Sequence, residues 1–81
     1  MPKYQRLLVR AQALSLIRDI QCRKATPDAR LNLARNLSYY LGRQYENADV
    51  NPFRTIEADD KIADLMPHMI ESFNQGAGVQ L

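Results

Sequence analysis

The chain has 81 residues, which is enough for one domain with a thin core, since folding at this size hides only about 60 to 65% of the surface of the unfolded chain. Straight-chain helix formers outnumber β-branched and aromatic residues, and Trp is absent, so the composition favours helix over sheet. A single cysteine, Cys22, excludes an internal disulfide, and no apolar run approaches the roughly 18 to 20 residues that span a bilayer. We therefore expect a cytoplasmic protein that makes no membrane contact.

The formal net charge of +2 hides a strong polarity along the chain. Residues 1–45 carry nine basic and two acidic side chains, whereas residues 46–81 carry two basic and seven acidic side chains. Opposite charges of this kind either attract each other within one domain or give a basic and an acidic face separate partners. Attraction within the domain is the simpler interpretation.

The first predicted helix runs from about residue 3 to residue 24 and is apolar on two sides. One stripe at helical spacing predicts a core-facing side and comprises Val9, Ala13, Leu16, Ile17 and Ile20. A second apolar set covers much of the opposite side and comprises Tyr4, Leu7, Leu8, Ala11 and Leu14. A helix of this kind must be buried on both sides, so it lies either between two other helices or against another chain. The second set is therefore the predicted partner interface, with a homodimer as one form of it.

The second predicted helix covers residues 27–43. Thr26 is a good N-cap, Pro27 suits the first helical position, and Gly42 offers a stop near the end. The side opposite its apolar face carries a basic and aromatic stripe, which comprises Asn32, Arg35, Tyr39 and Arg43. Guanidinium groups suit phosphate and carboxylate, and Tyr can stack on a base or pack on a protein. The alternative is an ordinary solvated helix surface.

A loop is predicted over residues 44–55, because this segment is rich in Asn and Asp and contains a proline. Within it, Asn51, Pro52 and Phe53 match a short eukaryotic peptide-docking motif, although a tripeptide recurs by chance. A third helix is predicted over residues 56–75, where the apolar residues at helical spacing are Ile62, Met66, Met69, Ile70 and Phe73. It is expected to be kinked or split at Pro67, because a proline inside a helix removes a backbone donor. Residues 76–81 predict a flexible tail. The expected fold is an all-α domain, a small three-helix bundle that takes up residues 1–81.

The third predicted helix carries an acidic stripe on its outer side, which comprises Glu57, Asp60, Asp64 and Glu71. His68 lies in this stripe, but one histidine without cysteine partners does not make a metal-binding pattern. His68 is also far in sequence from Cys22, and the three glycines form no phosphate-binding loop. We therefore expect no enzyme activity, no cofactor and no metal.

Two functions from different classes fit these features. The leading hypothesis is a small helical interaction module of the regulator or inhibitor type that binds a protein partner, or a second copy of itself. The alternative is binding to nucleic acid, or to a nucleoprotein complex, through the basic first half, where the phosphate contacts would come from Arg6, Arg10, Arg18, Arg35 and Arg43. A third hypothesis uses the acidic stripe to mimic or block a nucleic-acid site.

Overall fold

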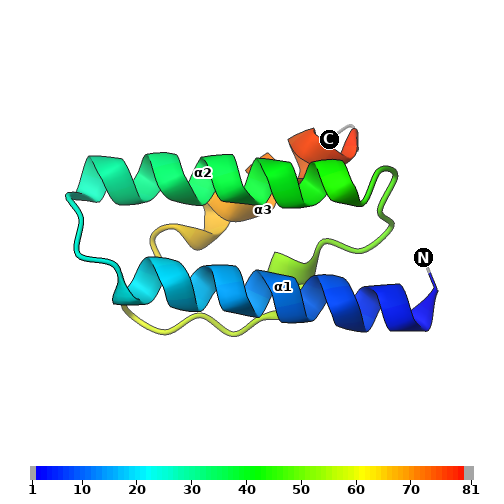
Figure 1. The fold of residues 1–81 in the computed structure, drawn as a ribbon, viewed down its shortest axis with the longest axis horizontal. Helices are drawn as coiled ribbons and strands as arrows, with labels where there is room; N and C mark the ends of the chain where they lie inside the picture. Colours follow the sequence, from blue (N-terminus) through cyan, green and yellow to red (C-terminus); the bar gives the residue numbers. More distant parts are fainter. Residues whose placement is uncertain (1, 80–81) are drawn as a thin grey trace.

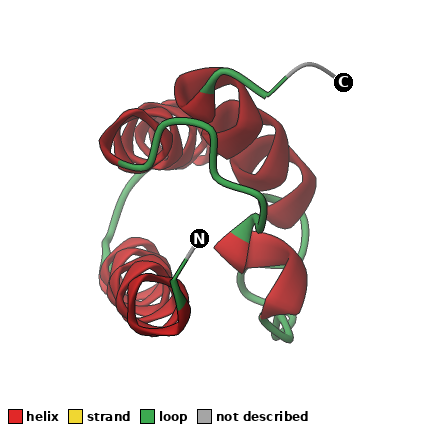
Figure 2. Ribbon diagram, turned by 90° about the vertical axis from the view of Figure 1, so that its right-hand side faces the viewer, coloured by secondary structure: helices red, strands yellow, loops and turns green. Residues whose placement is uncertain are grey.

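The computed structural model describes residues 2–79, which form three α-helices and one short 3-10 helix, with no strand among them. α1 (Lys3–Cys22) and α2 (Pro27–Gln44) run antiparallel and are joined by residues 23–26 (Figure 1). η1 (Pro52–Thr55) lies beside α1, and α3 (Met66–Ala77) lies beside α2, so that Figure 2 shows the four elements around a shared centre. The predicted all-α, three-helix architecture is confirmed.

The first two helices begin and end close to the predicted residues, because their boundary signals are local. The hydroxyl oxygen of Thr26 accepts a hydrogen bond from the backbone N–H of Ala29 at 3.2 Å, which caps α2. Pro27 occupies the first turn of α2, where no intrahelical N–H donor is needed. α1 ends at Cys22 rather than at residue 24, because Arg23 already has extended backbone angles.

The third helix begins ten residues later than predicted, at Met66 rather than at residue 56. The preceding residues form turns around Asp59, whose carboxylate accepts a hydrogen bond from the N–H of Lys61 at 2.9 Å. An Asp side chain that bonds to the backbone in this way stabilises a turn in competition with helix. Pro67 lies in the first turn of α3, where it is tolerated, so the predicted interruption near Pro67 is the start of the helix and not a kink within it.

The predicted flexible tail over residues 76–81 is wrong for its first part. Gly76 and Ala77 belong to α3 and are buried. Gly78 then adopts the left-handed conformation, with φ of 75°, and the N–H of Val79 donates to the carbonyl of Asn74 at 2.9 Å. This arrangement caps the end of α3 in the usual way for glycine. The remaining residues of the predicted tail, 80 and 81, lie outside the described residues.

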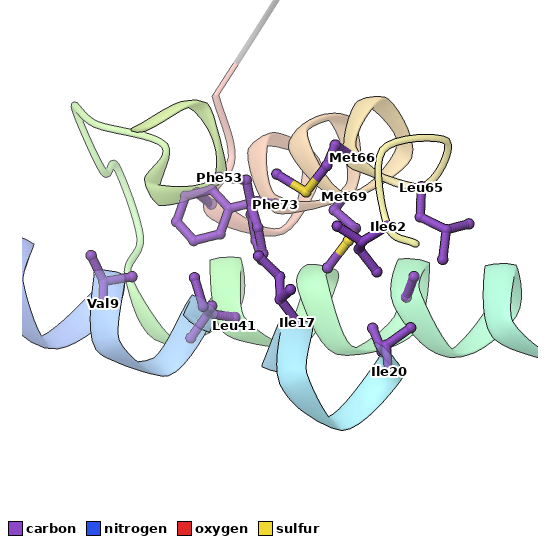
Figure 3. Close-up of a cluster of buried hydrophobic side chains, with 13 residues drawn as sticks. Val9, Ile17, Ile20, Leu41, Phe53, Ile62, Leu65, Met66, Met69 and Phe73 are labelled. Carbon is purple, nitrogen blue, oxygen red and sulfur yellow. The ribbon is translucent and has the colours of Figure 1, made fainter. Parts of the chain in front are cut away.

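The hydrophobic core joins all four elements (Figure 3). Phe53 of η1 and Phe73 of α3 pack edge to face with their ring centroids 6.1 Å apart. Side chains of α1 complete the core from the other side, and these are Val9, Ala13, Ile17 and Ile20. The core-facing stripe predicted for the first helix is therefore buried, except that Leu16 is only partly covered.

The position of α1 decides which surface stays open. α3 packs closely against α2, whereas α1 contacts α2 and η1 along one side only. α1 is thus an outer member of the bundle and does not lie between the other two helices (Figure 2). Its second apolar side is left exposed from Tyr4 to Ala11, and only Leu14 at its end is partly covered by the described part of the chain.

Candidate interaction surface

We call the second apolar side of α1 the outer face of α1, and it comprises Tyr4, Leu7, Leu8, Ala11 and Leu14. Successive residues of an α-helix are turned by about 100°, so this set points away from the buried stripe that begins at Val9. The relative exposure is 67% for Tyr4, 62% for Leu7 and 45% for Leu8. Ala11 is also exposed, and Leu14 is half-buried. The predicted interface residues are thus brought together on one accessible surface.

Single exposed apolar side chains are common on monomeric proteins, but a contiguous group is not. Tyr4, Leu7 and Leu8 lie within little more than one helical turn, and Ala11 and Leu14 extend the same surface by two further steps of three or four residues. A surface of this kind offers apolar contact area on a helix whose opposite side is held in the core. A partner would therefore meet a surface that is already ordered, which lowers the entropic cost of association.

The charges around the outer face of α1 are all positive. Lys3 lies four residues before Leu7, and Arg10 lies three residues after it. Arg18 lies four residues after Leu14, so each of the three cations is next to a leucine on the helix surface. All three cations are exposed, and no ion pair forms at any of them among residues 2–79. The remaining charges of α1 are engaged, because Arg6 pairs with Asp49 at 3.0 Å and Asp19 pairs with Arg23 at 2.9 Å.

The basic and aromatic stripe on α2 borders α3 instead of standing alone. All of its residues are exposed, namely Asn32, Arg35, Tyr39 and Arg43. A guanidinium nitrogen of Arg35 lies 3.1 Å from Nδ1 of His68, and both line a groove of about 360 Å³ between the two helices. The carboxylate of Glu71 lines the same groove. Arg35 and Tyr39 therefore face a mixed-charge environment, which suits phosphate less well than a purely basic surface would.

The predicted acidic stripe does not form. Glu57, Asp60 and Asp64 precede α3 and so do not share a helix face with Glu71. Asp60 and Asp64 instead line a wide, open depression of about 660 Å³ near the turn between α1 and α2. The stripe is predicted only if the helix begins before Glu57, as the apolar spacing from Ile62 onward suggests, whereas Asp59 directs a turn in this segment.

The depression beside Asp60 and Asp64 was not foreseen from the sequence. Four cations line it, namely Arg23, Lys24, Arg30 and Lys61. A guanidinium nitrogen of Arg30 donates to the backbone carbonyl of Lys61 at 2.9 Å, which holds the turn segment against α2. Charged side chains of both halves of the chain therefore line this depression, but no ion pair joins Asp60 or Asp64 to these cations among residues 2–79. The ion pair that does join the two halves is the one between Arg6 and Asp49.

Three further sequence features are placed by the structure. Asn51, Pro52 and Phe53 are buried, so the tripeptide is not accessible as a docking motif. The amide of Asn51 donates to the carbonyl of Ile70 at 2.8 Å and to Oδ1 of Asn74 at 3.0 Å, which ties the loop to α3.

Cys22 is exposed with a free thiol. No group of three His, Cys, Asp or Glu side chains that could hold a metal ion is found in the described part of the chain.

Comparison of the chain with protein-family models, with curated proteins and with solved structures gave no match. None of the helices within residues 2–79 combines the length and the apolar character needed to cross a bilayer.

Proposed function

We propose that this protein is a small, non-enzymatic helical module that binds a protein partner through the outer face of α1 and acts as a regulator or inhibitor of that partner. The observation that carries the proposal is the exposure of Tyr4, Leu7 and Leu8 together on one helix, whose opposite side is buried in the core. Burying such a group on a partner would contribute roughly 25 cal/mol for each Å² of apolar surface removed from water. The free thiol of Cys22 is compatible with a reducing compartment, so we place this function in the cytoplasm.

The nucleic-acid alternative has less support. Of the five arginines that it requires, Arg6 is paired with Asp49, and Arg35 is engaged with His68. Lys3, Arg10 and Arg18 flank the leucine side chains of the outer face of α1. Contact with phosphates would contribute little binding free energy from these leucines. A protein surface offers both apolar groups and carboxylates, so it satisfies both kinds of side chain on this face.

Site-specific photo-crosslinking tests the proposal. The photoreactive residue p-benzoylphenylalanine is placed at Leu7 in one variant and at Tyr40 in a control variant, because Tyr40 lies on α2 and is 64% exposed, close to the 62% of Leu7. Each variant is irradiated in a lysate of the source cells, with and without nuclease treatment. We expect a discrete covalent protein adduct from position 7, unchanged by nuclease, and none from position 40. Equal labelling from both positions, or an adduct lost on nuclease treatment, would contradict the proposal.

A further inference from the structure

We infer that the occupant of the outer face of α1 is an amphipathic helix of a different protein, with carboxylates placed opposite Lys3 and Arg10. This inference rests on the proposed function and adds the chemical class of the partner. Three observations carry it: the spacing of the apolar residues, the small residue at their centre, and the charges along their edges.

The apolar residues follow the spacing of a helix-pairing seam. Tyr4, Leu7, Ala11 and Leu14 are separated by three, four and three residues, which corresponds to positions a, d, a and d of two heptads. Such a seam presents a row of side chains that interdigitates with another helix. It ends at Arg18, which occupies the next a position, so it is long enough for a few turns of a partner helix and too short for an extended coiled coil.

The centre of the seam favours a helix over a flat apolar surface. Ala11 is exposed and small, and it lies between Leu7 and Leu14. A small residue between larger ones leaves a groove into which a ridge of side chains on a partner helix can pack. Against a lipid surface the same alanine would simply reduce the apolar area available for insertion.

The edges of the seam favour an acidic partner. Lys3 and Arg10 occupy successive g positions, where charged side chains select a partner by pairing across the seam. The corresponding e positions hold Leu8 and Ser15, neither of which is charged. Because Lys3 and Arg10 have no ion-pair partner among residues 2–79, both are available to carboxylates of another helix.

A second copy of this chain fits the seam poorly. In an antiparallel pair the g positions of the two copies meet, so Lys3 and Arg10 would lie against the same cations of the other copy. In a parallel pair they would lie against Leu8 and Ser15, which offer no carboxylate. The one carboxylate of α1, Asp19, already pairs with Arg23 at 2.9 Å. Charge therefore favours a partner of another sequence.

Two synthetic helical peptides test the inference with the full chain. Both carry Leu at the a and d positions over three heptads, and one carries Glu and the other Lys at the e and g positions. Binding is measured by fluorescence anisotropy of the labelled peptides at low and at physiological salt. We expect the Glu peptide to bind about tenfold more tightly than the Lys peptide, with a smaller difference at the higher salt.

Charge reversal on the protein provides the decisive variant. Lys3→Glu combined with Arg10→Glu should reverse the preference, so that the Lys peptide binds more tightly. Lys24→Glu combined with Arg54→Glu makes the same change in net charge at exposed positions away from the seam, and it should leave the Glu peptide preferred. Leu7→Ser combined with Leu8→Ser should abolish binding of both peptides.

Other possible occupants of the outer face of α1 would each give a different experimental result. Equal binding of the two peptides, binding of neither, or an unchanged preference after reversal at Lys3 and Arg10 would overturn the inference and leave the proposed function to the crosslinking test. Sedimentation equilibrium that shows a dimer, dissociated by the Leu7 and Leu8 variant, would identify a second copy and also overturn it. Cosedimentation with vesicles of phosphatidylcholine and phosphatidylserine, lost in that same variant, would overturn both the inference and the proposed function.

Discussion

Gly42 of α2 and Gly76 of α3 lie where the two helices pack closely, and each faces the backbone of the other helix. A Cβ atom on Gly42 would overlap the carbonyl oxygen of Phe73, and a Cβ atom on Gly76 would overlap that of Tyr39. The obstacles are backbone atoms, which cannot move aside as a flexible side chain can. The pair therefore fixes the distance between α2 and α3, and with it the position of Phe73 in the core.

Replacing either glycine with alanine should destabilise the protein. An added methyl group at this crossing must separate the two helices, and overpacking of this kind costs about 1 to 3 kcal/mol. That cost opposes the gain of up to about 1 kcal/mol that alanine brings to a helix interior. We expect Gly42→Ala and Gly76→Ala each to lower the free energy of unfolding, measured by urea denaturation followed by circular dichroism.

Ala11→Gly provides the matched control, because Ala11 is exposed in the middle of α1. There only helix propensity acts, so the change from alanine to glycine should itself cost about 1 kcal/mol. Alanine is thus expected to be the better residue at position 11 and the worse one at positions 42 and 76. A gain in stability from Gly42→Ala would show that the helices are not held this close.

Ser38, one helical turn before Gly42 on α2, carries a buried hydroxyl group. Ser38 is fully buried on α2, and its Oγ has no hydrogen-bond partner in the described structure. A buried polar group without a partner costs about 1 to 3 kcal/mol, and alanine fits the same space. Ser38→Ala should therefore raise the free energy of unfolding by about 1 kcal/mol or more. Ser15→Ala, at an exposed helix position, should gain only the few tenths of a kcal/mol that helix propensity supplies, and an equal gain at both positions would exclude a buried unsatisfied hydroxyl.

The sequence predicted α1 and α2 well because their signals are local. Thr26 and Pro27 mark the start of α2, and the apolar stripe that begins at Val9 marks the buried side of α1. The beginning of α3 was missed because Ile62 continues the apolar spacing of that helix, although Asp59 directs a turn just before it. That turn depends on one side chain competing for backbone donors, which periodicity does not register.

The candidate surface was predictable in composition but not in exposure. Tyr4 and Leu7 stand out in the sequence because the stripe that begins at Val9 already supplies a core-facing side. Whether a second apolar side is covered depends on where the other helices pack, and this is a tertiary property. The spacing of Ser38 and Gly42 could have indicated a close helix crossing, since small residues four apart share a helix face, yet Gly42 was interpreted only as a stop signal.

Asn51 should be the most sensitive polar residue of the loop. Its amide donates to the carbonyl of Ile70 and to Asn74, and its Oδ1 accepts from the N–H of Phe53 at 3.0 Å. Asn51→Ala removes all three bonds and leaves buried groups without partners, so the free energy of unfolding should fall by about 2 to 4 kcal/mol. Thermal and urea denaturation measure this loss. Asn36→Ala, at an exposed position of α2, should stay within about 0.5 kcal/mol of the unaltered protein, and a comparable loss there would contradict a specific role for Asn51.

The outer face of α1 should contribute almost nothing to folding, in contrast to the buried side of the same helix. Ile20 is fully buried, so Ile20→Ala leaves a cavity in the core and should cost about 2 to 5 kcal/mol. Leu7 remains exposed in the folded chain, so Leu7→Ala should change the free energy of unfolding by no more than about 0.5 kcal/mol. Urea denaturation of the two variants at low protein concentration measures both values. A loss of 2 kcal/mol or more from Leu7→Ala would mean that this leucine is covered in the folded protein, either by its own chain or by a tightly bound second copy. A small effect would show that Leu7 is not needed for folding, so that a loss of binding in Leu7→Ala arises from the surface itself.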